Sequence, residues 1–300
     1  MTGGSRKMDR EKALSRMKAQ RTRQIWLGVL KHVIVLIVGF FMIYPLIWML
    51  MASFNQTDEI FHNPGLLPTT WDFSNYPTGW QGVGGRHTFT TFFMNSFFYA
   101  GLATVGAVIS SSLVAYSFSR GTYRGKKVLF AIMLGTLLLP AQILMVPQYL
   151  WFHALGWIGS YLPLIVPAFF GGAFFIFLLT NFMNAIPREL DESAKIDGCS
   201  SYGIYARIIM PLSVPALITA ALFSFIWRWD DFLGPLLYVQ GRTQQFPVTL
   251  ALRVFADPTT VTNWGAFFAM SVLSLAPAVF IFIFFQRYLV EGISTTGLKG

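Results

Sequence analysis

Two adjoining stretches decide the fold of this chain: residues 162–186, LPLIVPAFFGGAFFIFLLTNFMNAI, and residues 187–211, PRELDESAKIDGCSSYGIYARIIMP. The first contains no Asp, Glu, Lys or Arg. The hydrocarbon core of a membrane, about 30 Å thick, needs about 20 apolar residues in a helix, so this stretch is predicted to span it. The second mixes charged and apolar residues at helical spacing and is predicted to form short helices at the membrane surface.

The composition extends this prediction to the whole chain. Of 300 residues, 54% are hydrophobic and only 12% charged, against about 25% charged in soluble domains. This excludes an ordinary soluble enzyme, a disordered chain and a fibrous protein. Six segments are long and apolar enough to be transmembrane helices, so an all-α polytopic membrane protein is expected. The predicted spans are 33–51, 92–118, 128–149, 162–186, 212–232 and 264–285.

Prolines and a glycine pair fall inside or at the start of these spans. Proline frees a backbone carbonyl that must find protein or water rather than lipid. Broken helices are typical of proteins that open a path through a membrane, although kinks in a plain helix bundle are an equal alternative at any one proline. The residues concerned are Pro140, Pro147, Pro163, Pro167, Pro215 and Pro277, with Gly171-Gly172 in the fourth span.

The basic residues set the orientation. The net charge is +9, but it is grouped in blocks rather than spread, which argues against a nucleic-acid partner. With both termini in the cytoplasm, 18 of the 22 Lys and Arg residues fall on the cytoplasmic side, as the positive-inside rule requires. The basic arm 1–32 either binds anionic lipid or, as we favour, only fixes the orientation.

The sequence offers little for metal or redox chemistry. Cys199 is the single cysteine, so an intrachain disulfide and a cysteine-based zinc site are both excluded. The four histidines are far apart in the sequence and form no ligand pair. No metal is expected.

The surface segment 187–211 is predicted to fold as helix, corner and helix. Pro187 suits a first helical position, Gly198 can end that helix in a left-handed conformation, and Ser200 can cap the next helix. Small residues at Ser193 and Ala194 would let another protein approach closely. We expect a docking site for a cytoplasmic partner, with a folded connecting loop as the alternative.

The same segment resembles a known family. Glu192-Ser193-Ala194, three residues, Gly198, nine residues, Ile208, one residue and Met210-Pro211 is similar to the E-A-A loop of binding-protein-dependent ABC importer permeases, whose pattern is E-A-A, three residues, G, nine residues, I-x-L-P. It departs from that pattern only at Ser193 and Met210. Three further motifs look like the carbohydrate-uptake, maltose-transporter subgroup of this family, and the tail looks similar to its smaller permease subunit. They are Asn95-Ser96, Ala115-Tyr116 with Arg120, Trp229-Asp230-Asp231-Phe232, and residues 286–300.

The resemblance implies a type I ABC importer transmembrane domain and roles for particular residues. The helix docked on the ATPase would use Leu190, Glu192, Ser193, Ala194, Ile196, Asp197, Gly198 and Tyr202. The tail reaching the ATPase would be Thr295, Thr296, Gly297, Leu298, Lys299 and Gly300. The loop meeting the binding protein would be Val239, Gln240, Gly241, Arg242, Thr243, Gln244 and Gln245.

The resemblance also implies partners: a second permease, two cytoplasmic ATPases that hold ATP and Mg, an extracytoplasmic sugar-binding protein, and membrane lipid. This chain has no G-x-x-x-x-G-K-[ST] phosphate loop, so it is not expected to be an enzyme or to hold a cofactor. Charged, polar or aromatic residues within spans are candidates for the substrate path, here Asn181, Trp229, Asp230 and Asp231. A structural corner formed by Arg228, Asp230 and Asp231 is the favoured alternative.

Four parts are expected: the arm 1–32, a first span with its outer loop 33–88, a transmembrane domain 89–286 that includes the coupling loop 187–211, and a tail 287–300. The expected function is a subunit of an ATP-driven carbohydrate importer in a bacterial inner membrane. The alternatives are a permease for a non-sugar solute, a secondary transporter and a membrane-embedded enzyme.

Overall fold

The computed structural model describes residues 3–62, 65–82, 87–239, 241–256 and 263–297. Every regular element within these ranges is a helix, so the all-α prediction is confirmed for that part of the chain. The chain divides into two compact units, Met1–Asp72 and Phe73–Gly300.

The first unit is dominated by one long helix, α1 (Gly3–Ala52), followed by the short α2 (Thr57–His62). Within α1 the stretch Gln24–Ala52 is long and apolar enough to cross a membrane, and none of its most apolar window is buried by the rest of the protein. Large apolar side chains on every side of a helix are stable only in lipid or against another protein. The predicted first span lies inside this stretch.

The second unit contains the remaining helices, named here in chain order. They are α3 (Asn75–Trp80), α4 (Phe89–Arg120), α5 (Lys126–Thr136), α6 (Ala141–Ala154), α7 (Leu162–Ile165), η2 (Val166–Phe170), α8 (Ala173–Ala185), α9 (Glu189–Ile196), α10 (Ser201–Ile204), the π-helical η3 (Tyr205–Ile209), α11 (Met210–Leu212), α12 (Val214–Trp229), α13 (Leu233–Tyr238), η4 (Thr243–Gln245), α14 (Val248–Phe255) and α15 (Trp264–Gly297).

Helix α4 is the centre of this unit and packs against α8 and α12. Its buried face carries small residues four positions apart, namely Ala103, Ala107, Ser111, Ala115 and Ser119. Small side chains let neighbouring backbones approach closely, which is how helices associate where the hydrophobic effect is weak. Hydroxyl groups add hydrogen bonds between elements, such as Ser224 Oγ to Thr104 Oγ1 at 3.2 Å and Ser112 Oγ with Tyr205 Oη at 2.7 Å.

The described residues hold four helices that could each cross a membrane, or up to six spans if each of two bent pairs counts as one. The expected break at Gly171-Gly172 is confirmed: Gly171 has φ +86°, and α8 starts directly after the pair. The expected interruption of the third predicted span at Pro140 is also present. Helices α5 and α6 meet at 96°, because Pro140 has no N–H to continue the helix and disfavours helical geometry in the residue before it.

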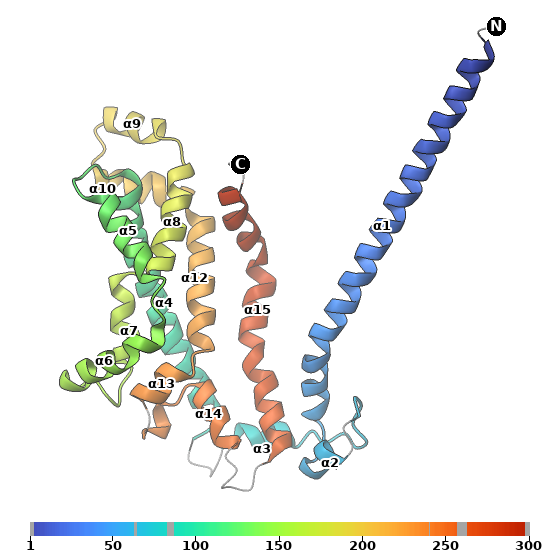
Figure 1. Ribbon diagram of the computed structural model, residues 1–300. Helices are drawn as coiled ribbons and strands as arrows, with labels where there is room; N and C mark the ends of the chain where they lie inside the picture. The colour runs from blue at the N-terminus through green and yellow to red at the C-terminus, as the bar shows by residue number, and fades with distance from the viewer. Residues whose placement is uncertain (1–2, 63–64, 83–86, 240, 257–262, 298–300) are drawn as a thin grey trace. The chain divides into compact units, whose positions relative to one another are not determined.

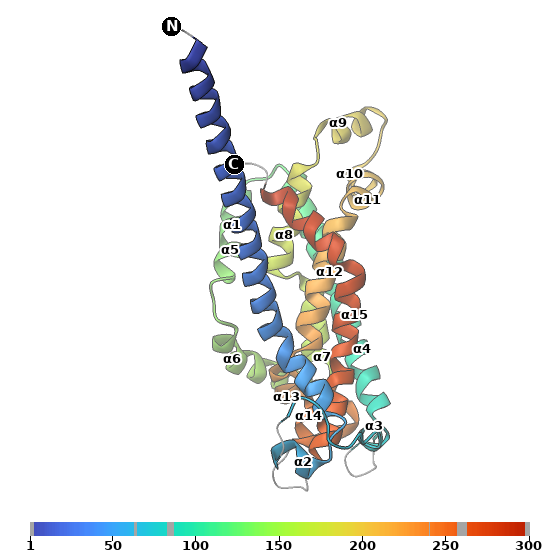
Figure 2. The same cartoon turned by 90° about the vertical axis from the view of Figure 1, so that its right-hand side faces the viewer.

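The second unit has two distinct ends (Figure 1 and Figure 2). Helices α9 and α10 lie at one end, on the same side as the C-terminal part of α15. Helices α3, α13 and α14 lie at the opposite end. A cluster of buried apolar residues, including Phe89, Val248, Phe255 and Met270, holds that opposite end together. The candidate coupling segment and the candidate outer loop are therefore on opposite ends of one bundle.

Candidate functional site: the α9 surface and the outer corner

The first helix of the surface segment is α9, and its limits follow from local chemistry. Ile186 takes an extended conformation before Pro187, as residues before proline do. The helix therefore begins at Glu189 with Arg188 as its N-cap, and the prediction that Pro187 is the first helical residue was wrong. Glu189, Asp191 and Glu192 sit in the first turn, where the helix dipole favours carboxylates.

The corner after α9 forms as predicted. Gly198 has φ +80°, a conformation that glycine adopts without strain. Ser200 then caps α10 by accepting a hydrogen bond from the backbone N–H of Gly203, 3.2 Å away. The segment is thus a defined helix, corner and helix rather than an irregular connection.

One side of this segment faces away from the protein. Leu190, Ile196 and Tyr202 are 43%, 88% and 74% exposed, and Glu192, Ser193, Asp197 and Gly198 are exposed beside them. Large apolar side chains grouped on an exposed surface mark contacts with another molecule. We call these seven residues the coupling surface.

Ala194 corrects the sequence analysis, which grouped it with the contact residues. It is only 6% exposed and belongs to the apolar core cluster that includes Ile204 and Ile209. Its small side chain lets α9 lie close to its own bundle, so it cannot be the surface on which a partner rests.

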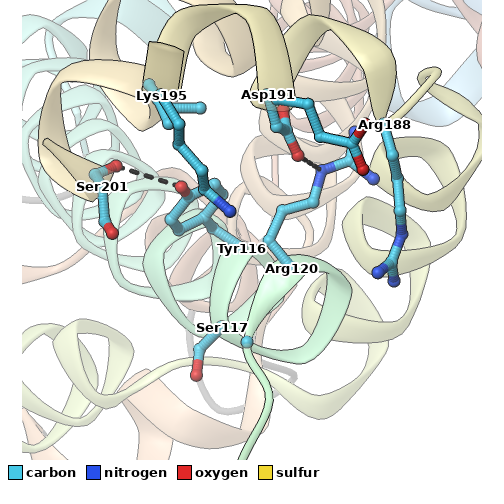
Figure 3. Close-up of a pocket in the computed structure, with 10 residues that line it drawn as sticks. Tyr116, Ser117, Arg120, Arg188, Asp191, Lys195 and Ser201 are labelled. Atoms are coloured by element: carbon cyan, nitrogen blue, oxygen red, sulfur yellow. Dashed lines mark hydrogen bonds and ion pairs between the residues drawn. The ribbon is translucent and has the colours of Figure 1, made fainter. Parts of the chain in front are cut away.

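A buried ion pair fixes α9 to the end of α4 (Figure 3). Arg120 Nε lies 2.7 Å from Asp191 Oδ2, and the two side chains are 7% and 9% exposed. Arg120 Nη2 also donates to the carbonyl oxygen of Ile186 at 2.9 Å. One guanidinium therefore contacts both α9 and the chain that leads into it, so α4 and α9 are held as one body.

A polar cavity lies beside this ion pair, between α4, α9 and α10. Its volume is about 310 Å³. Tyr116, on the α4 side, donates to the carbonyl oxygen of Ser201 at 3.0 Å and so joins α4 to α10. The lining residues are Tyr116, Ser117, Arg120, Gly121, Arg188, Asp191, Glu192, Lys195, Ser201 and Ile204. Both helices of the surface segment are thus tied to the inner end of α4.

The outer corner between α12 and α13 is built around Asp231. Its carboxylate accepts from Tyr99 Oη at 3.1 Å and from the backbone N–H of Gly234 at 3.0 Å, so Asp231 has a structural role. No ion pair among the described residues joins it to Arg228, so the expected pairing of Arg228, Asp230 and Asp231 with one another is not what holds the corner. Asp230 is exposed. Trp229 is 4% exposed and donates its indole N–H to the carbonyl of Ser274 at 3.0 Å, so we withdraw it as a path residue. Asn181 is half-buried on α8.

The candidate binding-protein loop follows α13. Gly241 to Gln244 are exposed, whereas Val239 is fully buried and therefore leaves the contact set. Asn95 on α4 donates to the carbonyls of Gln244 and Phe246 at 2.8 and 3.0 Å. Tyr161 Oη donates to the carbonyl of Gln245, so the loop is anchored at its base.

Several of the predicted site residues fall at the edge of what the structure describes. Gln240, Leu298, Lys299 and Gly300 lie outside the described residues. Thr295, Thr296 and Gly297 form the last residues of α15. Their proposed contacts stay predictions.

Gly234 offers a test of the outer corner. A Cβ at this position would meet the Asp231 carboxylate and come within 2.9 Å of Leu164 Cδ2. Because Tyr99 and the Gly234 N–H hold that carboxylate, we expect Gly234→Ala to destabilise the protein by about 1–3 kcal/mol. Gly101→Ala is the control, since its Cβ meets nothing within 4 Å and alanine favours a helix interior by about 1 kcal/mol. In thermal unfolding of the detergent-solubilised complex, Gly234→Ala should lower the midpoint temperature and Gly101→Ala should raise it. An unchanged midpoint for Gly234→Ala would contradict the packing at this corner.

Two features were missed by the sequence analysis: the pairing of Arg120 with Asp191, and Gln148 on α6, which lines an outer cavity. The sequence did contain one indication of this pair. Arg120 lies at the end of a span and Asp191 in a surface helix, and their opposite charges can form an ion pair. Nothing in the sequence spacing singled out Gln148.

Comparisons with known proteins agree with this architecture. The fold is similar to that of a permease chain in the crystal structure of a bacterial ABC transporter that imports the acidic polysaccharide alginate, with a TM-score of 0.77 and 24% identity over 87% of this chain and 96% of that one. The protein is therefore an all-α, multi-pass membrane protein with the fold of a type I ABC importer transmembrane domain.

The sequence comparisons define the family. The chain is 34% identical to the probable ABC transporter permease YurM of Bacillus subtilis, over 86% of this chain and 84% of YurM. It is 32% identical to the trehalose/maltose transport system permease MalG of Thermococcus litoralis, over 91% and 98% of the two chains. Residues 107–295 match the family model described as "Binding-protein-dependent transport system inner membrane component". The chain belongs to this family.

Proposed function

We propose that this chain is one of two permease subunits of an ATP-driven importer that takes up an oligosaccharide delivered by an extracytoplasmic binding protein. The coupling surface carries the proposal. It is an exposed surface of α9, the Gly198 corner and α10 that includes the large apolar side chains Leu190, Ile196 and Tyr202. A buried ion pair joins α9 to the central helix of the bundle. Such a helix would transmit movement of a bound partner to α4 through this ion pair.

The partner at the coupling surface would be the ATPase, which would hold ATP and Mg. The sequence of this chain contains no phosphate-binding loop of its own. Closure of two ATPases on ATP would push α9, and α4 would turn the bundle toward the binding protein, whose docking loop would be Gly241 to Gln245. Thr295 to Gly300 would add a second ATPase contact. With both termini in the cytoplasm, the basic residues would lie mostly on the ATPase side.

The substrate assignment draws on the relatives. One is named for trehalose/maltose transport, and another, 30% identical over 88% of this chain and 93% of its own, is the arabinooligosaccharides permease AraQ of Halalkalibacterium halodurans. The substrate path would pass Asn181, Asp230 and Asp231.

Cross-linking in the assembled transporter tests the coupling surface. In a Cys199→Ser background, Ile196→Cys should cross-link to the ATPase, because this side chain is 88% exposed. Thr243 is exposed and follows α13 and precedes α14 in the chain, two helices at the end opposite α9 (Figure 1). Thr243→Cys should therefore react with a membrane-impermeant thiol reagent added outside. Uptake of radiolabelled trehalose or arabinotriose into proteoliposomes should require ATP on the ATPase side. Labelling of Ile196→Cys from outside, or uptake by this chain without an ATPase subunit, would overturn the proposal.

A further inference from the structure

A second cavity lies at the outer end of the bundle, next to the candidate binding-protein loop. Its volume is about 350 Å³, near the lower end of the range of about 300–1,000 Å³ for small-molecule sites. Its lining combines aromatic and polar side chains from α4, α6, α12 and α13. The residues used below are Tyr99, Gln148, Trp227, Arg228, Asp231 and Tyr238.

Trp227 supplies an aromatic surface that is held in place. Phe174, Phe175 and Phe223 surround its indole at centroid distances of 5.0, 5.5 and 5.8 Å, yet the side chain is 50% exposed and lines the cavity. A fixed aromatic ring with open surface is suited to the apolar C–H face of a sugar ring, because both faces are apolar while the polar groups lie at the edges.

Polar groups with unused hydrogen-bonding capacity lie beside this ring. The Nη1 group of Arg228 is held by Ser224 through its backbone oxygen at 3.1 Å and its hydroxyl at 2.5 Å. No described residue accepts a hydrogen bond from the remaining guanidinium N–H groups, and the exposed amide of Gln148 has no described hydrogen-bond partner. Neighbouring hydroxyls of a sugar can use such donors and acceptors together.

The charges in the lining balance. Arg228 is the one cation and Asp231 the one carboxylate among the residues that line the cavity. Asp231 is already hydrogen-bonded to Tyr99 and Gly234, so it is fixed as an acceptor and a negative charge. A sugar carboxylate placed here would meet the negative charge of Asp231 as well as the positive charge of Arg228, so the lining has no net charge that would favour an acidic sugar over a neutral one.

The cavity is also continuous with the loop that would receive the binding protein. Tyr238 ends α13 and lines the cavity, and the loop begins at the next residue. The carbonyl of Tyr238 accepts from the backbone N–H of Gly159 at 2.6 Å. The Tyr238 ring stacks on the ring of Tyr149 in α6, with a distance of 6.4 Å between the ring centroids. A sugar released at the loop would therefore meet this cavity early in its passage.

We propose that this cavity is an outer subsite for one unit of a neutral oligosaccharide, with Trp227 stacking on the sugar ring and Gln148 and Arg228 binding its hydroxyls. The inference rests on the proposed function. It adds where on this chain the sugar binds and that the sugar is uncharged.

The test uses the complete transporter in proteoliposomes, with four radiolabelled probes: trehalose, arabinotriose, diacetylchitobiose and a uronic-acid trisaccharide. For the neutral probe with the lowest wild-type KM, Trp227→Ala should raise KM about tenfold, the equivalent of about 1.4 kcal/mol. Trp227→Phe should raise it less, because a ring is retained, and Gln148→Ala, an exposed side chain, should raise it about threefold to tenfold. ATP hydrolysis at saturating sugar should stay near wild type.

Trp26→Ala is the matched control, since this exposed tryptophan lies on α1 in the other unit, and its KM should not change. Three results would overturn the inference alone: transport with wild-type KM in all lining variants, preference for the uronic-acid probe, or cross-linking of Gln148→Cys to the second permease, which would mean that a protein side chain fills the cavity. ATP-dependent uptake of none of the four probes would count against the proposed function and, with it, the subsite.

Discussion

Arg120→Leu is expected to destabilise the protein by about 3–5 kcal/mol, the usual result of removing one partner from a buried ion pair. The reason is the charge left behind. Asp191 would stay buried in the α9 first turn with its ion-pair partner gone. Its other oxygen, Oδ1, already has no hydrogen-bond partner among the described residues. The change also removes the Arg120 hydrogen bond to Ile186, so α9 should loosen from α4.

A double variant separates the pair from the rest of the packing. Arg120→Leu with Asp191→Leu removes both charges and should be less destabilising than either single change, because no buried charge is left unpaired. Arg124→Leu serves as the control, because this arginine is exposed in the loop that follows α4 and surface substitutions shift stability by about 0.5 kcal/mol or less. Thermal unfolding of the solubilised complex compares the two single variants, the double variant and the control with wild type. Equal losses for the double variant and for Arg120→Leu would show that the ion pair does not hold α9.

The same variants also report on coupling. If α9 passes motion to the bundle through α4, Arg120→Leu should lower sugar uptake more than ATP hydrolysis in the reconstituted transporter. The proteins should be compared at a temperature where all are folded. A parallel fall in both activities would indicate loss of folded protein rather than loss of coupling.

Local chemistry made much of the fold predictable. Gly198, Ser200 and the Gly171-Gly172 break act through backbone preferences and short-range hydrogen bonds, and each lies where the sequence predicted it. The apolar spans were also predictable, because the thickness of the membrane sets the length of helix that is needed.

What the sequence could not predict depends on contacts between distant residues. Arg120 and Asp191 form an ion pair although they are 71 positions apart in the sequence. Trp229 and Ser274 form a hydrogen bond although they are 45 positions apart. Whether a side chain such as Ala194 faces a partner or the core of its own chain depends on which helices pack against it. The spacing of residues in the sequence does not determine this. The sequence predicted an interruption at Pro140, but the 96° angle between α5 and α6 could not be predicted from it.

The second large effect is expected at Gly198. Gly198→Asp should assemble with the ATPase in part but lose at least about 90% of sugar uptake while ATP hydrolysis continues. Within this chain the site has room, because a Cβ at Gly198 would meet nothing within 4 Å. The backbone strain is limited to about 1–2 kcal/mol for a non-glycine residue in this left-handed conformation, and Asp tolerates it better than most. A large functional loss must then come from what lies against this exposed corner in the assembled transporter.

Gly156→Asp provides the matched control for that argument. Gly156 has φ +71° and equally open space, but it follows α6, away from the α9 end of the unit. If backbone strain were the cause, both variants would lose uptake alike. If the corner of the coupling surface meets the ATPase, only Gly198→Asp should separate hydrolysis from uptake. Gly198→Asn should fall between wild type and Gly198→Asp, because it keeps the left-handed preference without placing a new negative charge beside Glu192 and Asp197. Wild-type uptake in Gly198→Asp would mean that this corner touches no moving partner, and the coupling surface would then have to be sought elsewhere on the inner end of the bundle.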